Sequence, residues 1–232
     1  MKTETIISEL KRVADPERKK AVKTMFPTSM EYLGVRTPTM RQLLKKWHND
    51  VQNMPPEKLI AFSKQLVETQ IFEANQVAFE LLWQNKTALN QLNLSDLEYL
   101  GQNMDNWATT DSFSIMLSGW AWRNNQITDN NILEWLSSEN RWWKRAAVVS
   151  TIPLNLRARG GTGDTQRTLM ICEKVVDSRD DMIVKALSWA LRELSKSDKP
   201  AVQKFMEKYD SKLHPRVRRE VYTKLETGRK KG

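Results

Sequence analysis

The chain has 232 residues, 40% of them hydrophobic, which is enough to bury a continuous core in one large domain or two small ones. It has one cysteine and two histidines, which exclude an intrachain disulfide and a zinc site built on Cys and His. Residues 1–140 hold 15 Lys and Arg against 17 Asp and Glu, and residues 141–232 hold 22 against 11. This basic C-terminal part predicts a polyanionic partner. Nucleic acid is the first candidate and an anionic membrane is the second.

The N-terminal segment MKTETIISEL lacks the apolar core of a signal peptide, and no apolar run approaches the length of a membrane span. We therefore expect a protein of the cytosol, in bacteria of the cytosol and nucleoid.

Apolar residues recur at spacings of three and four along almost the whole chain, which predicts an all-α fold with helices of about 10–16 residues. Polar residues mark three helix starts: Thr37 before a proline, Ser95 with Glu98 as a capping box, and Asp198 before a proline.

The helices also repeat. Aligning RWWKRAAVV, MIVKALSWA and PRVRREVYT places Arg145, Lys185 and Arg219 in one slot, 40 and then 34 residues apart. Asp111 lies 34 residues before Arg145, and Glu73 lies 38 before Asp111. Such periods are typical of HEAT-like repeats of two helices, so we predict one domain over residues 1–232, a curved solenoid with a concave binding face.

The segment RARGGTGDT at 157–165 holds three of the eight glycines. It lacks the GxxxxGK[ST] pattern of a phosphate-binding loop, so we interpret it as a flexible loop between helices. The alternative is a loop whose Arg157 and Arg159 touch a phosphate backbone. The tail at about 227–232 is a candidate for disorder.

One basic helix face includes a tryptophan. Lys185, Trp189, Arg192 and Lys196 fall on one side of the helix around 183–196, opposite its apolar stripe. A tryptophan is often a core residue, but one among cations suits stacking on a sugar or base while the charges hold phosphates.

The segment 106–117 predicts a second polar helix face that includes a tryptophan, with Trp107, Asp111, Ser114 and Ser118 on the side away from the core. Asp111 occupies the slot that later repeats fill with cations. It is either paired with Arg145 or placed at a helix end, or it is a carboxylate aimed at a developing cation.

Two basic runs, RWWKR at 141–145 and RVRR at 216–219, are candidates for nucleic-acid contact. The first includes Trp143 and Lys144. Either run is alternatively a solvated surface.

With these segments in view, the chain resembles the AlkD-type DNA alkylation repair glycosylases, a family of HEAT-like repeat proteins. The resemblance rests on YLGVRTPTMRQLLKKW at 32–47, NWATTDS at 106–112, RWWKRAA at 141–147 and VKALSWALREL at 184–194. In that family a Trp and an Asp one turn apart, an Arg and a second Trp form the active cleft. These fall on Trp107, Asp111, Arg145 and Trp189.

The resemblance implies excision of cationic N3- and N7-alkylated purines, such as 3-methyladenine and 7-methylguanine, from duplex DNA without base flipping. We expect a monomer that acts on duplex DNA, has no membrane partner, and uses no cofactor and no metal. In this interpretation Asp111 stabilises the sugar cation and orients water, Trp107 and Trp189 pack against the deoxyribose, and Arg145 binds a phosphate. The expected DNA contacts are Arg36, Thr37, Trp143, Lys144, Lys185, Arg192, Arg216, Arg218 and Arg219.

Two other classes of function stay open: a non-catalytic repeat scaffold that binds DNA or RNA, and a protein-interaction solenoid. Relatives often have a second Trp and an Asp beside the first Trp, where this chain has Asn106 and Ala108. The range of lesions is left open by that difference.

Overall fold

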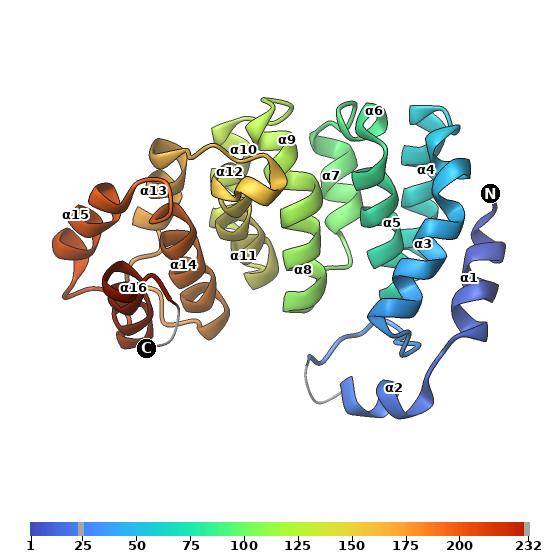
Figure 1. Ribbon diagram of the computed structural model, residues 1–232, viewed down its shortest axis with the longest axis horizontal. Helices are drawn as coiled ribbons and strands as arrows, with labels where there is room; N and C mark the ends of the chain where they lie inside the picture. Colours follow the sequence, from blue (N-terminus) through green and yellow to red (C-terminus); the bar gives the residue numbers. More distant parts are fainter. Residues whose placement is uncertain (23–25, 230–232) are drawn as a thin grey trace. The chain divides into compact units, whose positions relative to one another are not determined.

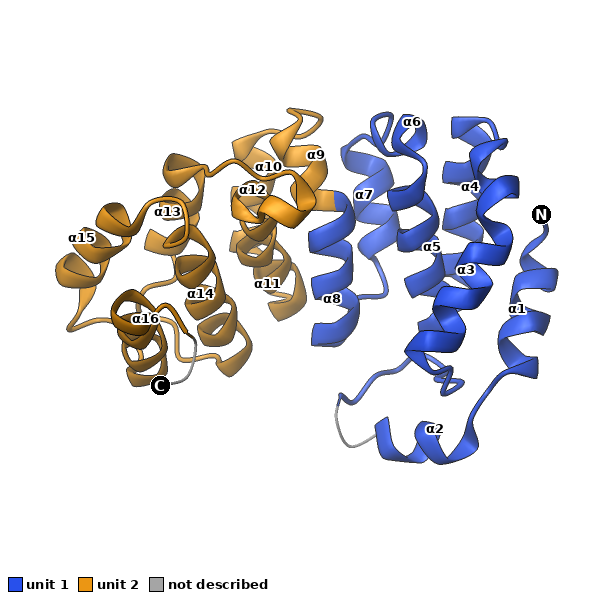
Figure 2. Cartoon of the chain, in the orientation of Figure 1, with its two compact units in different colours: residues 1–117 blue, residues 118–232 orange. Residues whose placement is uncertain are grey.

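The computed structural model describes residues 1–22 and 26–229, and the chain divides into unit 1, Met1–Leu117, and unit 2, Ser118–Gly232 (Figure 2). The described residues form helices and no strand, and a single isolated bridge pairs Glu31 with Ile71. The prediction of an all-α fold is confirmed.

Unit 1 is built from two layers of helices. The helix α5 packs against α3 on one side and α8 on the other, and α4 and α7 lie against this row (Figure 1). The helices of unit 1 are α1 (Thr3–Arg12), α2 (Pro16–Val22), α3 (Thr37–Gln52), α4 (Pro56–Glu68), α5 (Phe72–Gln84), α6 (Lys86–Leu89), α7 (Leu94–Gly101) and α8 (Trp107–Phe113).

A buried carboxylate fixes the segment that leads into α3. Glu73, in the first turn of α5, accepts hydrogen bonds from the backbone N–H groups of Leu33 (3.0 Å), Gly34 (2.7 Å) and Val35 (3.1 Å). Gly34 has φ +91°, and a Cβ there would lie 2.2 Å from the carbonyl oxygen of Asp15, so only glycine fits. Burial raises the pKa of Glu73 and outweighs the amide hydrogen bonds, which favour the charged form.

Unit 2 repeats the layered arrangement. The helix α14 packs against α11 and α16, and α10, α13 and α15 lie against these three. The helices of unit 2 are α9 (Gly119–Arg123), α10 (Asp129–Ser137), α11 (Arg141–Val149), α12 (Ile152–Asn155), the 3-10 helix Arg157–Arg159, α13 (Thr165–Glu173), α14 (Asp181–Leu194), α15 (Lys199–Tyr209) and α16 (Pro215–Thr227).

The aligned slot has a counterpart in the helices. Asp111, Arg145, Lys185 and Arg219 are each the fifth residue of their helix, in α8, α11, α14 and α16 respectively. Glu73 is the second residue of α5 and is buried, so it does not fit this register.

Two of the three predicted helix starts need correction. Asp198 caps α15 as predicted. Thr37 is the first residue of α3 and does not cap it, because the cap position falls one residue earlier. The capping box of α7 is made by Asn93 and Asp96, two residues before the predicted pair.

The prediction for Ser114 and Ser118 is wrong, because both are fully buried. Ser114 donates to the carbonyl of Thr110 one turn earlier, so its hydroxyl is satisfied inside the protein and can face the core. From Ser114 to Ser118 the chain also forms a π-helix, whose wider turns end the 3.6-residue periodicity used in the prediction.

Hydrogen bonds fasten the glycine-rich loop. The guanidinium of Arg123 donates to the carbonyl oxygens of Pro153 and Arg159, both at 2.8 Å. Gly161 is buried, and a Cβ there would lie 2.5 Å from the Pro153 oxygen. The loop is therefore held closely by its own unit, with Arg157 exposed at its start. Of the tail, residues 230–232 lie outside the described part of the chain.

Candidate nucleic-acid interface and active site

The surface of unit 1 presents one large aromatic side chain. Trp107 is 38% exposed, and no other large hydrophobic residue within 1–22 and 26–229 is as exposed. It begins α8, whose first turn is capped by Asn106 through a hydrogen bond from the Thr109 N–H at 3.0 Å. Phe26 meets the Trp107 ring edge-on, with ring centroids 5.6 Å apart and the planes at 83°. Phe26 in turn stacks on Phe72 at 5.2 Å, so the exposed ring rests on an aromatic cluster.

Asp105 ties the segment around Phe26 to the start of α8. One carboxylate oxygen accepts from the hydroxyl of Thr28 at 2.7 Å, and the other accepts from the N–H and hydroxyl of Ser29 at 2.5 and 2.7 Å. Burial acts to raise the pKa of Asp105, but these hydrogen bonds and one from Asn106 outweigh it and hold the pKa below its usual value.

Asp111 lies one helical turn after Trp107 and is half-buried. Unit 1 thus presents an exposed indole and a carboxylate on successive turns of one helix.

Unit 2 contains a small basic pocket of about 300 Å³ between α11, α14 and α16. Its lining residues are Arg145, Lys185, Trp189, Arg192, Arg216 and Glu220. The structure therefore brings five of the sequence-predicted site residues of this unit together around one pocket.

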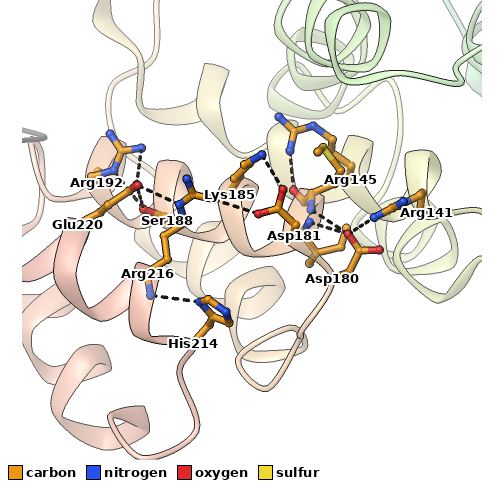
Figure 3. Close-up of polar contacts among 12 residues, drawn as sticks. Arg141, Arg145, Asp180, Asp181, Lys185, Ser188, Arg192, His214, Arg216 and Glu220 are labelled. Atoms are coloured by element: carbon orange, nitrogen blue, oxygen red, sulfur yellow. Dashed lines mark hydrogen bonds and ion pairs between the residues drawn. The ribbon is translucent and has the colours of Figure 1, made fainter. Parts of the chain in front are cut away.

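Acidic side chains hold the cations of this pocket (Figure 3). Asp181 pairs with Lys185 at 2.6 Å and with Arg216 at 2.9 Å. Glu220 pairs with Arg216 at 3.3 Å and with Arg192 at 3.6 Å. The hydrogen bond from Lys185 is the largest of the effects that lower the pKa of Asp181, and burial lowers the pKa of Arg192.

Arg145 lines the pocket and is fixed by a hydrogen bond to the backbone. Its side chain is buried, and one guanidinium nitrogen donates to the carbonyl oxygen of Met182 at 2.5 Å. Met182 lies in the first turn of α14, which Asp180 caps while also pairing with Arg141 at 2.7 Å (Figure 3). The position of Arg145 therefore depends on the start of the neighbouring helix.

A protein-family comparison identifies the chain. A family model described as DNA alkylation repair enzyme matches residues 6–225. The chain belongs to this family of DNA alkylation repair enzymes. A structure described as a predicted DNA alkylation repair enzyme from Enterococcus faecalis is similar in fold, with a TM-score of 0.75 and 20% sequence identity over 92% of this chain and 97% of that one. No curated protein matches the sequence.

The charge of this DNA alkylation repair enzyme is concentrated in unit 2. Unit 1 has 14 Lys and Arg and 14 Asp and Glu, so the whole net charge of +9 lies in unit 2, with 23 against 14. No described helix has the length and apolar character needed to cross a bilayer. Likewise, no group of three or more His, Cys, Asp or Glu suited to a metal is found in residues 1–22 and 26–229.

The other predicted DNA contacts lie outside the basic pocket. Arg36 is exposed and pairs with Asp15 at 2.7 Å, beside the exposed Thr37. Trp143 packs on Trp135 of α10, with ring centroids 4.9 Å apart, and Lys144 is half-buried. This places Trp143 in the contact between α10 and α11.

Near the C-terminus, Arg218 pairs with Asp210 at 3.2 Å, and Arg219 is exposed. Arg216 lines the pocket, although the aligned slot pointed to Arg219.

Sequence reasoning missed the acidic and hydroxyl groups that organise both units: Asp105, Asp181, Ser188 and Glu220. The i,i+4 spacing of Asp181 and Lys185 was a usable signal. The partners of Asp105 and Glu220 lie far along the chain and leave no local pattern.

Proposed function

We propose that this DNA alkylation repair enzyme is a DNA glycosylase that excises N3- and N7-alkylated purines from duplex DNA without flipping the base. The observation that carries the proposal is the pair on α8, an exposed Trp107 with the carboxylate of Asp111 one turn away. The basic pocket of unit 2, with Trp189 among its cations, supports DNA as the substrate.

The chemistry follows from the charge of the lesion. An alkyl group on N7 or N3 makes the purine cationic, so the base leaves neutral when the glycosidic bond breaks and its electron pair goes to the base. Positive charge then develops on the deoxyribose, where an anion and an aromatic face stabilise it. Water adds its oxygen to C1′ and gives up a proton.

Each residue has a role in this scheme. The carboxylate of Asp111 stabilises the sugar cation and takes the proton of the attacking water. Trp107 and Trp189 pack their rings against the deoxyribose, and Arg145 donates to a phosphate. The reaction as proposed needs no metal and no general acid for the base. The two histidines have no role in this scheme. His214 accepts a hydrogen bond from the backbone N–H of Arg216, and the His48 ring contacts the side chain of Gln84.

The test is the substitution Asp111→Asn, assayed on duplex DNA with one 7-methylguanine under single-turnover conditions. Removing the negative charge should slow excision by about 10²–10³-fold, corresponding to ~3–4 kcal/mol of transition-state stabilisation. The affinity for unmodified duplex should stay the same or rise slightly, because a charge that repels phosphate is lost.

The matched control is Asp50→Asn, the same change at an exposed position of α3. Excision by Asp111→Asn at the wild-type rate would refute the proposed mechanism. Salt-dependent duplex binding by a wild-type protein that releases no base would favour a non-catalytic DNA-binding scaffold.

A further inference from the structure

Glu220 of α16 lies at the basic pocket with both carboxylate oxygens engaged (Figure 3). One oxygen accepts from the hydroxyl of Ser188 at 2.7 Å and lies 3.6 Å from the guanidinium of Arg192. The other accepts from Nε of Arg216 at 3.3 Å. The Glu220 side chain is only 16% exposed, so solvent screens these contacts weakly.

This set of donors also suits a phosphate group. Phosphate oxygens in protein–DNA complexes are held mainly by Arg and Lys, with Ser hydroxyls adding hydrogen bonds. Ser188 is fully buried, and its hydroxyl also accepts a hydrogen bond from Nε of Arg192 at 3.2 Å. The hydroxyl is therefore held in place with its proton directed at an anion.

We propose that Glu220 is an internal substitute for a DNA phosphate. In the free protein it holds Arg192 and Arg216 and offsets their mutual repulsion. A backbone phosphate displaces it and takes over its donors, Ser188 included. Glu220 thereby lowers the affinity for DNA and limits the time spent on undamaged duplex. The inference rests on the proposed function, because it takes DNA as the partner.

Asp181 pairs with two cations of the pocket, Lys185 and Arg216, and is a weaker competitor with phosphate than Glu220. Its pair with Lys185 is an i,i+4 pair between side chains that are 56% and 40% exposed, and such exposed pairs contribute little. Arg192 and Glu220 are 14% and 16% exposed. Neutralising Glu220 should therefore change DNA affinity more than neutralising Asp181.

The test is Glu220→Gln, with dissociation constants for an unmodified duplex measured by fluorescence anisotropy over a range of salt concentrations. Removing the carboxylate should tighten binding roughly three- to tenfold at moderate salt, the range expected for losing a competing, partly buried ion pair. The gain should shrink as salt rises, because solution anions then compete for the freed cations. Asp181→Asn should give a smaller gain.

The matched control is Glu173→Gln, which makes the same charge change in unit 2 and breaks the exposed pair with Lys208 at 3.2 Å. It should alter the affinity by no more than about twofold, as for an exposed pair. Glu220→Asp keeps the charge but pulls it back by one methylene, and should give a gain between wild type and Glu220→Gln.

The two proposals fail in different ways. If the wild-type protein binds duplex and releases 7-methylguanine, the proposed function stands. If both Glu220 variants then bind the duplex no more tightly than Glu173→Gln, this inference is overturned. A wild-type protein with no salt-dependent affinity for DNA overturns both.

Discussion

Replacing Asp105 with Asn removes the carboxylate that joins the segment around Phe26 to the start of α8. The asparagine keeps one acceptor oxygen, which faces Thr28 and Asn106. Its NH₂ group replaces the oxygen that accepts from the N–H of Ser29, so this contact becomes one between two donors. Hydrogen bonds to charged groups contribute about 1.5–3 kcal/mol, and Asp105 is half-buried, so we expect a loss of about 2 kcal/mol.

For a chain of this length the loss corresponds to a fall in melting temperature of about 4–8 °C. The same change should loosen the edge contact of Phe26 with Trp107 and reduce the single-turnover excision rate about tenfold, because small misplacements of catalytic groups are costly. The affinity for unmodified duplex should not change. Activity assays are run below the melting point of the variant.

The stability that Asp105 contributes depends on pH. The folded-state pKa of Asp105 lies below its usual value, so its stabilising contribution is present above the unfolded pKa and is lost as pH falls through the folded pKa. The difference in melting temperature between wild type and Asp105→Asn should be constant above about pH 5 and narrow below about pH 4. Equal melting temperatures and equal excision rates for Asp105→Asn and the control Asp50→Asn would refute this reasoning.

Further predictions concern stability and DNA affinity. Glu73→Ala leaves the buried N–H groups at 33–35 without their acceptor and should lower the free energy of unfolding by about 3 kcal/mol or more. A decrease of less than about 1 kcal/mol in chemical denaturation, the contribution of one hydrogen bond, would contradict this prediction. Gly161→Ala forces a Cβ to 2.5 Å from the Pro153 oxygen and should lower the melting temperature, whereas Gly228→Ala meets no neighbouring atom and should lower it less, by the strain of an alanine at φ +71° alone. Arg192→Ala should flatten the log–log salt dependence of duplex binding by about 0.9, one phosphate contact, and an unchanged slope would exclude that contact.

The parts of the fold that depend on local periodicity were predictable. The all-α class and the shared fifth position of Asp111, Arg145, Lys185 and Arg219 follow from spacings within and between helices. Ser114 was misplaced because a hydroxyl that bonds to its own helix counts as polar in the sequence but can be buried.

The organisation of the site was much less predictable. The contact of Asp105 with Thr28 joins residues 77 positions apart, and that of Ser188 with Glu220 joins residues 32 apart. Such contacts depend on how helices pack, and no short pattern encodes them. Arg145, Lys185 and Arg192 were found from their spacing and Arg216 from its basic run, whereas the anions that hold the cations of the basic pocket were not found.

The central claim is that the positive charge of the lesion drives its departure. It is tested most directly by incubating the wild-type protein with matched duplexes that carry 7-methylguanine, 3-methyladenine, uracil, hypoxanthine or 8-oxoguanine, and measuring the free base by chromatography. We predict release of the two cationic bases and of none of the neutral ones. Efficient release of any neutral base would contradict the account, because it would require a general acid.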